Sequence, residues 1–168
     1  MFSFSNICFY GGGAWGQALA ITLASLGHKS TLIVSDQIRA DEINSHTSKK
    51  FPHIQLSHLI NASVNASATI KKSNLVFVTT ESKRVIDVVK QIFLLKNDNI
   101  SLVITSKGFA TKDGKTFNEI IKDQFPTLKT GILTGPTFAD EIANNLPAAA
   151  VLASNNIAFA NSICSLFQ

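Results

Sequence analysis

The sequence predicts an α/β fold of the Rossmann type, in which helices cover both faces of a doubly wound, mainly parallel sheet. Three observations predict this class. Short apolar runs alternate with helical stretches of about ten residues along the chain. A glycine cluster at residues 11–16 separates the first apolar run from the first helical stretch. The chain has 168 residues, of which 45% are hydrophobic, so we expect residues 1–168 to form one domain of this type.

The expected elements follow from the spacing of the apolar residues. Strands are predicted at residues 6–10, 30–34, 64–69, 74–79, 100–105 and 131–133, with an extended segment at 148–153. Helices are predicted at residues 14–26, 37–45, 83–95, 115–125, 138–143 and 157–166. In the first helix, Leu19, Leu23 and Leu26 share one face, and Gly27 provides a C-terminal stop. No closing signal follows the last helix, so we expect this chain to be a piece of a longer protein.

The glycine cluster contains Gly11, Gly13 and Gly16 at the spacing of the G-x-G-x-x-G dinucleotide-binding pattern. A strand before it and a helix after it supply the context that this pattern needs. In such loops the first glycine permits a tight turn, the second lets the backbone approach a pyrophosphate, and the third lets the helix pack closely on the strand. The helix N-terminus then faces the phosphates. A flexible glycine loop is the alternative interpretation.

An acidic residue stands near the end of the second predicted strand. Asp36 lies 20 residues after Gly16, close to the offset at which such folds place an acceptor for the adenosine ribose hydroxyls. A carboxylate there repels a 2′-phosphate, so the sequence favours NAD over NADP, and Arg39 lies three residues further on. Asp36 is equally well placed to cap the 37–45 helix, and the two roles are compatible.

Two further segments follow predicted strands, and so they lie on the ligand side of a parallel sheet. Lys107 comes after the 100–105 strand, with a plain surface lysine as the alternative. Gly135 and Pro136 set a turn after the next strand, and Thr137 is placed to cap the helix that follows. The free amides of that helix predict a second anion site, with a plain capped helix as the alternative.

Composition and charge exclude several function classes. The net charge of +4 is scattered, and the lysine pairs at 49–50 and 71–72 form no basic stripe, so nucleic-acid binding is not expected. Cys8 and Cys164 do not make a disulfide framework, and the histidines lack ligand spacing, so no metal site is expected. The N-terminus does not resemble a signal peptide, and no apolar run approaches the roughly 20 residues of a transmembrane helix. We therefore expect a cytoplasmic protein that does not insert into membranes.

With these residues identified, the chain resembles the N-terminal domain of NAD(P)-dependent glycerol-3-phosphate dehydrogenase. Its GGGAWGQALAITLASLGH segment is similar to the family's G-x-G-x-W-G-x-A-L-A opening. Its TSKGF segment resembles the family's lysine-glycine motif, and TGPTFADEIANNLPAAAVLAS resembles the family's G-P-S/T-F-A-x-E motif and the strand after it. The three motifs occur in order along the whole chain, which makes them far more specific than any one alone.

The resemblance implies an oxidoreductase that transfers hydride between C4 of a nicotinamide and C2 of glycerol 3-phosphate or dihydroxyacetone phosphate, for phospholipid synthesis. It also implies a homodimer for the full-length protein. With Asp36 from the strand-end argument, the expected cofactor-binding residues are Gly11, Gly13, Ala14, Trp15, Gly16, Ser35, Asp36, Lys107 and Ala139. The expected substrate-binding residues are Lys107, Gly135 and Thr137.

The chain also departs from the family pattern. Ser35 stands where the family often has a basic residue, which argues for NAD and leaves NADP as the alternative cofactor. Thr80 replaces a usual proline, and Asn145 replaces a common glycine. The family's second, helical domain, which carries the proton-accepting lysine, is absent from residues 1–168. We therefore expect this chain alone to be inactive, with Lys107 in a supporting role.

Two alternative functions remain open at this point. One is a non-catalytic dinucleotide-binding module, a truncated copy that binds the cofactor without turning it over. The other is a related dehydrogenase that acts on a hydroxy acid, and the GPTFADE segment argues against it.

Overall fold

The computed structural model of the chain describes residues 2–95, 100–107, 110 and 114–168. Within these residues, the strands form one seven-stranded sheet in the order β3-β2-β1-β4-β5-β6-β7, and every neighbouring pair is parallel except β6 and β7. The strands are β1 (Ile7–Tyr10), β2 (Ser30–Ile33), β3 (Ile60–Ser63), β4 (Leu75–Val78), β5 (Ser101–Ile104), β6 (Lys129–Thr134) and β7 (Val151–Ala153). The helices are α1 (Ala14–Ser25), α2 (Gln37–Asn44), α3 (Ala66–Lys72), α4 (Val85–Leu94), α5 (Phe117–Gln124), α6 (Ala139–Ala143) and α7 (Ile157–Cys164), with short 3₁₀ turns η1 (Ser82–Arg84) and η2 (Ser165–Phe167).

The order of the strands places a topological switch between β1 and β4. The chain builds outward from β1 to β2 and β3, and then returns to place β4 on the other side of β1. In the parallel register, Cys8 pairs with Thr31 on one side and with Val76 on the other. Ligands of open α/β sheets bind at the carboxyl ends of the strands beside such a switch. In this chain that position lies directly after Tyr10, where the glycine loop begins.

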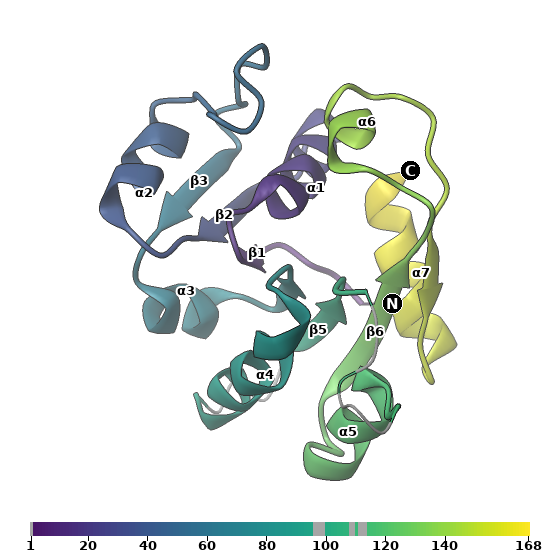
Figure 1. The fold of residues 1–168 in the computed structure, drawn as a ribbon. Helices are drawn as coiled ribbons and strands as arrows, with labels where there is room; N and C mark the ends of the chain where they lie inside the picture. Colours follow the sequence, from purple (N-terminus) through teal and green to yellow (C-terminus); the bar gives the residue numbers. More distant parts are fainter. Residues whose placement is uncertain (1, 96–99, 108–109, 111–113) are drawn as a thin grey trace.

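Two helix layers cover the sheet, because consecutive strand residues point to opposite faces (Figure 1). Phe9 of β1 stacks on Phe77 of β4, with 4.9 Å between ring centroids, on the face that α1, α2 and α7 cover. Cys8 and Val76 point to the opposite face, which α3, α4 and α5 cover. Both faces are therefore packed, and the predicted doubly wound α/β fold is confirmed.

The predicted strand at 64–69 is wrong. The third strand lies earlier, at Ile60–Ser63, and the residues that follow it form α3. Asn65 caps this helix by accepting a hydrogen bond from the Ala68 amide at 2.9 Å. β3 is rich in residues with weak strand propensity, and its pairing with β2 holds it, so tertiary contact overrides local propensity here. The other predicted strands and helices are present, with ends that shift by a few residues.

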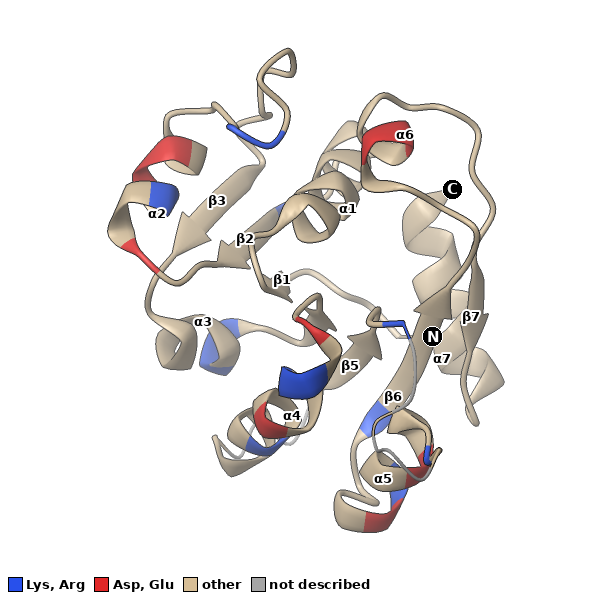
Figure 2. Ribbon diagram, viewed as in Figure 1, with Lys and Arg blue, Asp and Glu red and all other residues tan. Residues whose placement is uncertain are grey.

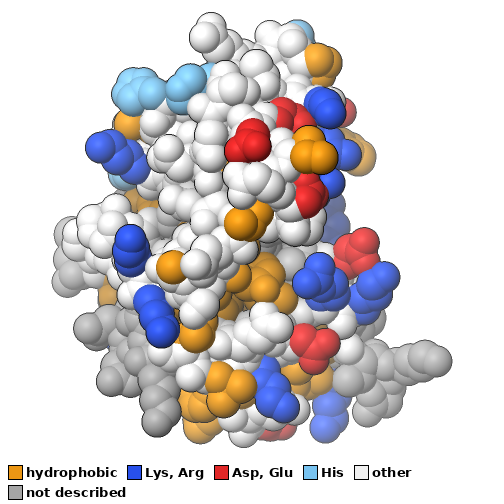
Figure 3. All heavy atoms as spheres, turned by 90° about the vertical axis from the view of Figure 1, so that its left-hand side faces the viewer, with side chains coloured by type: hydrophobic (Ala, Val, Ile, Leu, Met, Phe, Trp, Pro, Cys, Tyr) orange, Lys and Arg blue, Asp and Glu red, His pale blue; other side chains and the backbone are white. Residues whose placement is uncertain are grey.

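Charged side chains are dispersed over the described surface. α1 carries none, whereas basic and acidic residues occur together on α2 and α5 (Figure 2). On the face drawn in Figure 3, lysine and arginine side chains stand among acidic and uncharged ones. In the part of the chain that the structure describes, no His, Cys, Asp and Glu side chains are grouped as a metal site would need. No helix in that part is long and apolar enough to cross a membrane.

Candidate functional site

The glycine loop joins β1 to α1 at the carboxyl end of the sheet, and packing requires two of its glycines. Gly11 has a φ of +125°, and a Cβ on it would lie 2.9 Å from the Thr79 carbonyl oxygen. A Cβ on Gly16 would collide with the Gly11 carbonyl oxygen, and it would lie 2.9 Å from the Thr79 hydroxyl. The tight turn at Gly11 and the close approach of helix to strand at Gly16 are therefore both present.

Gly13 differs from its neighbours in the loop. An added Cβ there would meet no atom within 4 Å. Its backbone is extended, with φ −72° and ψ 179°, a conformation that any residue adopts. Neither packing nor backbone geometry accounts for a glycine at this position. Open space in front of the backbone is what the close approach of a pyrophosphate requires.

The N-terminus of α1 lies directly behind Gly13 and has no side-chain cap. The amides of the first turn, which include those of Ala14 and Trp15, have no partner within the helix. Because α1 is 12 residues long, these amides and the positive end of the helix dipole together suit an anion. The cofactor contacts implied for Ala14 and Trp15 thus have a physical basis in their backbone.

A cleft of about 560 Å³ opens beside the glycine loop. Its walls come from the ends of β1, β2 and β4, the first turns of α2 and α3, and η1, and they include Gly11, Gly13, Ser35, Arg39 and Thr80. Among the described residues, the Thr80 hydroxyl is buried without a hydrogen-bond partner. Residues expected to hold the two ends of ADP therefore come together in one cleft.

Asp36 stands at the N-cap of α2, beside this cleft. One carboxylate oxygen accepts a hydrogen bond from the Arg39 amide at 2.9 Å, and the other accepts one from the Ser35 hydroxyl at 2.9 Å. The Arg39 amide and the Ser35 hydroxyl lower the pKa of Asp36 below its usual value, so the group is charged at neutral pH. The capping role is thus confirmed, and the ribose contact stays a prediction.

Lys107 and Gly135 come together at the ends of β5 and β6. Both line a hollow of about 530 Å³, although 28 residues separate them in the sequence. The Lys107 side chain is exposed, and its backbone carbonyl accepts a hydrogen bond from the Ser82 hydroxyl at 3.0 Å. A Cβ on Gly135 would lie 2.6 Å from the Ala149 carbonyl oxygen, so the returning chain requires this glycine. Gly108 and Phe109 of the TSKGF segment lie outside the described residues.

The prediction that Thr137 caps the next helix is wrong. α6 begins at Ala139, and its N-cap is Phe138, whose amide donates to the Glu141 carboxylate at 3.3 Å. α6 has only five residues, too few to build the dipole that a second anion site at its N-terminus would use. Ala139, expected at the cofactor, is half-buried and packs against a small apolar cluster that α1 shares.

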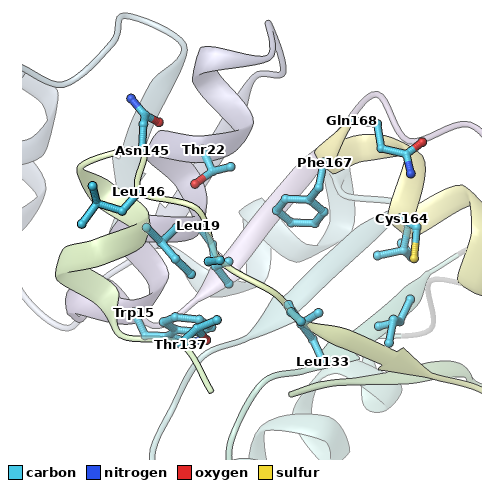
Figure 4. A pocket seen from close by; sticks show the side chains of 15 residues that line it. Trp15, Leu19, Thr22, Leu133, Thr137, Asn145, Leu146, Cys164, Phe167 and Gln168 are labelled. Carbon is cyan, nitrogen blue, oxygen red and sulfur yellow. The ribbon is translucent and has the colours of Figure 1, made fainter. Parts of the chain in front are cut away.

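Thr137 is instead buried beside Trp15, in an apolar hollow of about 470 Å³ between α1, α6 and α7. Figure 4 shows these two side chains next to one another, with Leu19 and Thr22 of α1 on one wall and Phe167 opposite. The indole nitrogen of Trp15 is buried without a hydrogen-bond partner among the described residues. Trp15, which was expected at the cofactor, and Thr137, which was expected at the substrate, thus line the same hollow. Lys107 lines a different one.

Sequence analysis did not assign several residues of the cleft to the site; they include Arg39, Thr79 and two basic residues of η1, Lys83 and Arg84. Arg39 lines it from one turn inside α2, and a basic residue facing a helix start carries no motif of its own. Thr79 directly follows β4, and its hydroxyl is within hydrogen-bonding distance of the carbonyl oxygens of Gly11, at 2.8 Å, and Tyr10, at 3.2 Å. Its position at the strand end next to the switch is the signal that could have identified it.

Proteins of known family are similar to this chain in sequence. Residues 6–160 match the family model described as NAD-dependent glycerol-3-phosphate dehydrogenase N-terminus. A glycerol-3-phosphate dehydrogenase (NAD(P)+) of Halothermothrix orenii is 36% identical over 160 residues, which cover 94% of this chain and 47% of that protein. The protein of the same name from Francisella tularensis subsp. novicida is 35% identical over 171 residues, which cover 97% and 50%. The chain spans about half the length of the curated relatives it matches.

Solved structures are similar to it as well. The crystal structure of glycerol-3-phosphate dehydrogenase from Coxiella burnetii has a TM-score of 0.86 at 25% identity, covering 96% of this chain and 50% of that one. The Plasmodium falciparum glycerol-3-phosphate dehydrogenase shares the fold, with a TM-score of 0.86 at 19% identity, over 97% of this chain and 49% of that one. The family match spans the glycine loop, Lys107 and the 135–139 segment. This chain therefore belongs to the family of NAD-dependent glycerol-3-phosphate dehydrogenase N-terminal domains.

Proposed function

We propose that residues 1–168 bind NAD(H) and form the cofactor half of a dehydrogenase that interconverts sn-glycerol 3-phosphate and dihydroxyacetone phosphate. The observation that carries this proposal is the open space at Gly13, directly in front of the uncapped α1. Neither the packing nor the backbone conformation requires a glycine at this position. Its place at the start of a long helix suits a bound pyrophosphate. Membership of the family supports the same class of cofactor.

In this proposal the nicotinamide supplies the hydride chemistry, and the chain binds and orients the two partners. The first-turn amides of α1 bind the pyrophosphate. The ammonium group of Lys107 binds a phosphate or hydroxyl oxygen of the substrate at the ends of β5 and β6, in the hollow that Gly135 also lines. Thr137 holds the substrate from the Trp15 side. The proton acceptor of the reaction lies outside these residues.

For the cofactor we propose NAD in preference to NADP. The Asp36 carboxylate is charged, and each of its oxygens keeps a lone pair after its hydrogen bonds to the Arg39 amide and the Ser35 hydroxyl. Those lone pairs suit the ribose hydroxyls, and the charge repels a 2′-phosphate. The Arg39 guanidinium, which lines the same cleft, attracts a 2′-phosphate, so NADP binds more weakly but is not rejected.

Calorimetric titration of residues 1–168 with NADH and NADPH at one ionic strength tests this function. We expect both to bind, and NADH to bind more tightly. The matched control is Gly13→Val, whose Cβ enters space that the protein leaves open and whose side chain occupies the space that the pyrophosphate needs. Tighter binding of NADPH would overturn the preference for NAD. Failure of the wild-type chain to bind either dinucleotide would overturn the proposal as a whole.

A non-catalytic dinucleotide-binding module is the second candidate, because the open space at Gly13 and the uncapped α1 suit a bound dinucleotide whether or not turnover follows. Both candidates predict cofactor binding, and only the dehydrogenase predicts that a longer protein with this segment reduces dihydroxyacetone phosphate. For that longer protein we propose a homodimer that feeds glycerophospholipid synthesis. The cytoplasmic location inferred from the sequence stays a prediction.

A further inference from the structure

The peptide bond between Gly12 and Gly13 joins two glycines, which have no side chains that could fix the orientation of this peptide. A larger residue cannot replace Gly12, because a Cβ there would collide with the Val34 side chain. At Gly13 the space is open. A peptide in this position can rotate about its flanking bonds unless something outside the loop holds it.

Gln17 supplies a contact that holds this peptide. Its side chain is 2% exposed, and its Nε2 donates to the Gly12 carbonyl oxygen at 3.0 Å. In a planar trans peptide the N–H points opposite to the C=O. Holding the Gly12 carbonyl toward Gln17 therefore directs the Gly13 amide away from this buried contact. An amide so directed adds a donor to those of the first turn of α1.

Ser48 in turn fixes the Gln17 side chain. Its hydroxyl, in a residue that is 4% exposed, donates to Gln17 Oε1 at 2.5 Å. The same hydroxyl oxygen accepts from the amides of Lys50 and Phe51, both at 3.1 Å. Because the Gly12 carbonyl can only accept, Nε2 must face it and Oε1 must face Ser48. The two side chains thus form a buried relay in which the donors and acceptors named here are matched.

The segment that carries Ser48 also contacts α6, which follows the GPTF motif. Phe51 is fully buried in an apolar cluster with Ala18 of α1 and Ala143 of α6. His53 Nε2 lies 3.0 Å from the Asn144 side-chain oxygen at the end of α6. The relay therefore ties the glycine loop to a segment that packs against both α1 and α6.

We propose that Gln17 and Ser48 are positioning residues for the dinucleotide, which hold the Gly12–Gly13 peptide with its amide directed at the pyrophosphate. The inference rests on the proposed binding of NAD(H). Neither side chain touches the cofactor, and both act through the Gly12 carbonyl. A relay with a purely structural role would lower stability without a specific loss of pyrophosphate binding, so the two roles differ in what they change.

The test measures ligand affinity and thermal unfolding for Ser48→Ala and for Gln17→Met, which keeps the side-chain length but removes both hydrogen bonds. We expect the Kd of NADH and of ADP-ribose to rise about tenfold, the equivalent of about 1.4 kcal/mol. Adenosine, which lacks the pyrophosphate, should bind as it does to the wild type. Ser48→Thr keeps the hydroxyl and should bind NADH nearly as the wild type does. Ser30→Ala is the matched control, because the Ser30 hydroxyl is buried and has no partner among the described residues.

The outcomes separate this inference from the proposed function. If the wild-type chain binds no NADH, the proposed function fails and the inference fails with it. If the wild type binds NADH and both variants match it, the positioning role is wrong and the proposed function stands. An equal loss for NADH and adenosine would show a general structural effect and would also overturn the inference. Ser48→Ala, the smaller change, decides the matter if Gln17→Met does not fold.

Discussion

Thr79 donates its hydroxyl to the Gly11 carbonyl oxygen at 2.8 Å, and this bond ties the end of β4 to the turn from which α1 begins. The same hydroxyl is what a Cβ on Gly16 would approach to 2.9 Å. Gly11 and Gly16 are therefore parts of one packed contact, and the packing of the fold requires a glycine at both positions. Gly13 lies outside this contact, and in the proposed function it is a glycine because the pyrophosphate needs the space in front of it.

This division predicts opposite behaviour for two alanine variants. Gly13→Ala should unfold at the wild-type temperature, because its Cβ enters open space and its backbone suits alanine. Its NADH affinity should fall at least tenfold, because the methyl group stands where the pyrophosphate approaches. Gly16→Ala should lose about 1–3 kcal/mol of folding free energy, because its Cβ meets the fixed backbone of Gly11. Urea unfolding and calorimetry measure both quantities.

Each of the two variants has a result that would contradict this prediction. A Gly13→Ala chain that binds NADH normally would show that the open space is not the pyrophosphate site. A Gly16→Ala chain of wild-type stability would show that the contact with Thr79 yields easily, and the loop would then be less rigid than its packing implies.

A second prediction separates the charge of Asp36 from its cap. Asp36→Asn should keep the cap, because the asparagine side-chain oxygen accepts a hydrogen bond from the Arg39 amide as well as the aspartate oxygen does. Without the carboxylate, the repulsion of a 2′-phosphate disappears, so NADPH should bind more tightly and the preference for NADH should shrink. Asp36→Ala, which also loses the cap, should melt at a lower temperature. Parallel titrations with the two cofactors check the first effect, and thermal unfolding checks the second.

Asp36 should also contribute to the loss of folding stability at low pH. The Arg39 amide and the Ser35 hydroxyl lower the folded-state pKa of Asp36. A lowered pKa stabilises the fold above the unfolded value of about 3.9, and this contribution disappears as the pH falls through the folded-state value. Asp36→Asn lacks this contribution, so its stability should fall less steeply than that of the wild type below about pH 4. Identical acid profiles would contradict the assignment.

Lys107 carries the third prediction. Its side chain is exposed, so Lys107→Ala should fold as the wild type does. In the presence of NADH, the variant should lose affinity for dihydroxyacetone phosphate, because the charge beside Gly135 is gone. Lys107→Arg should restore little, since a planar guanidinium does not replace a compact ammonium. Lys90→Ala, which removes an exposed lysine of α4, is the matched control. Equal substrate affinity in the two alanine variants would remove Lys107 from the site.

The two cysteines give a fourth prediction. Burial raises the pKa of the Cys8 thiol to about 12, and a hydrogen bond with Ser73 lowers it in part. Cys164 is exposed at the rim of the Trp15 hollow. Since the thiolate is the reactive form, a chromogenic disulfide reagent at about pH 8 should modify one thiol in the native chain and two in urea. Rapid modification of both in the native chain would mean that β1 opens readily.

The strands that are buried on both faces could be predicted from the sequence, because such burial requires apolar residues along the whole strand. β1, β4 and β5 are apolar on both faces, and a parallel sheet covered on two sides requires that pattern. β3 was not predictable in the same way, because its residues Ile60–Ser63 are mostly polar or small and only their pairing with β2 makes them a strand. Local spacing cannot contain that information.

The candidate site shows the same limit. Lys107 and Gly135 could be brought together from sequence, because both follow neighbouring parallel strands whose carboxyl ends share one edge. The Gln17–Ser48 relay could not, because it joins residues 31 positions apart through a loop with no regular spacing. The Thr137 cap failed for a smaller reason: α6 begins one residue later than a threonine cap would need.

The last prediction is that residues 1–168 bind NADH but do not reduce dihydroxyacetone phosphate. The glycine loop, Asp36 and Lys107 are the residues that we propose for the cofactor side of the site. The family's proton acceptor is expected in a second domain, and loss of general acid–base help slows such a step by about 10²–10⁴-fold. Loss of the second wall also removes substrate orientation, so turnover should fall further than this factor alone. The assay follows NADH oxidation in the presence of dihydroxyacetone phosphate, with the Halothermothrix orenii relative as the positive control.

Binding must be measured in the same preparation, because absence of turnover has meaning only if the cofactor is bound. NADH saturation without oxidation would leave the missing proton acceptor and substrate wall as the cause. Turnover comparable to that of the full-length relative would overturn the prediction, and the acceptor would then have to lie within these residues. His53 is the first residue to replace in that case, because its ring already contacts the end of α6 through Asn144. A His53→Gln variant that abolished the turnover would place the proton transfer on the imidazole, a side chain that often acts as a general acid or base.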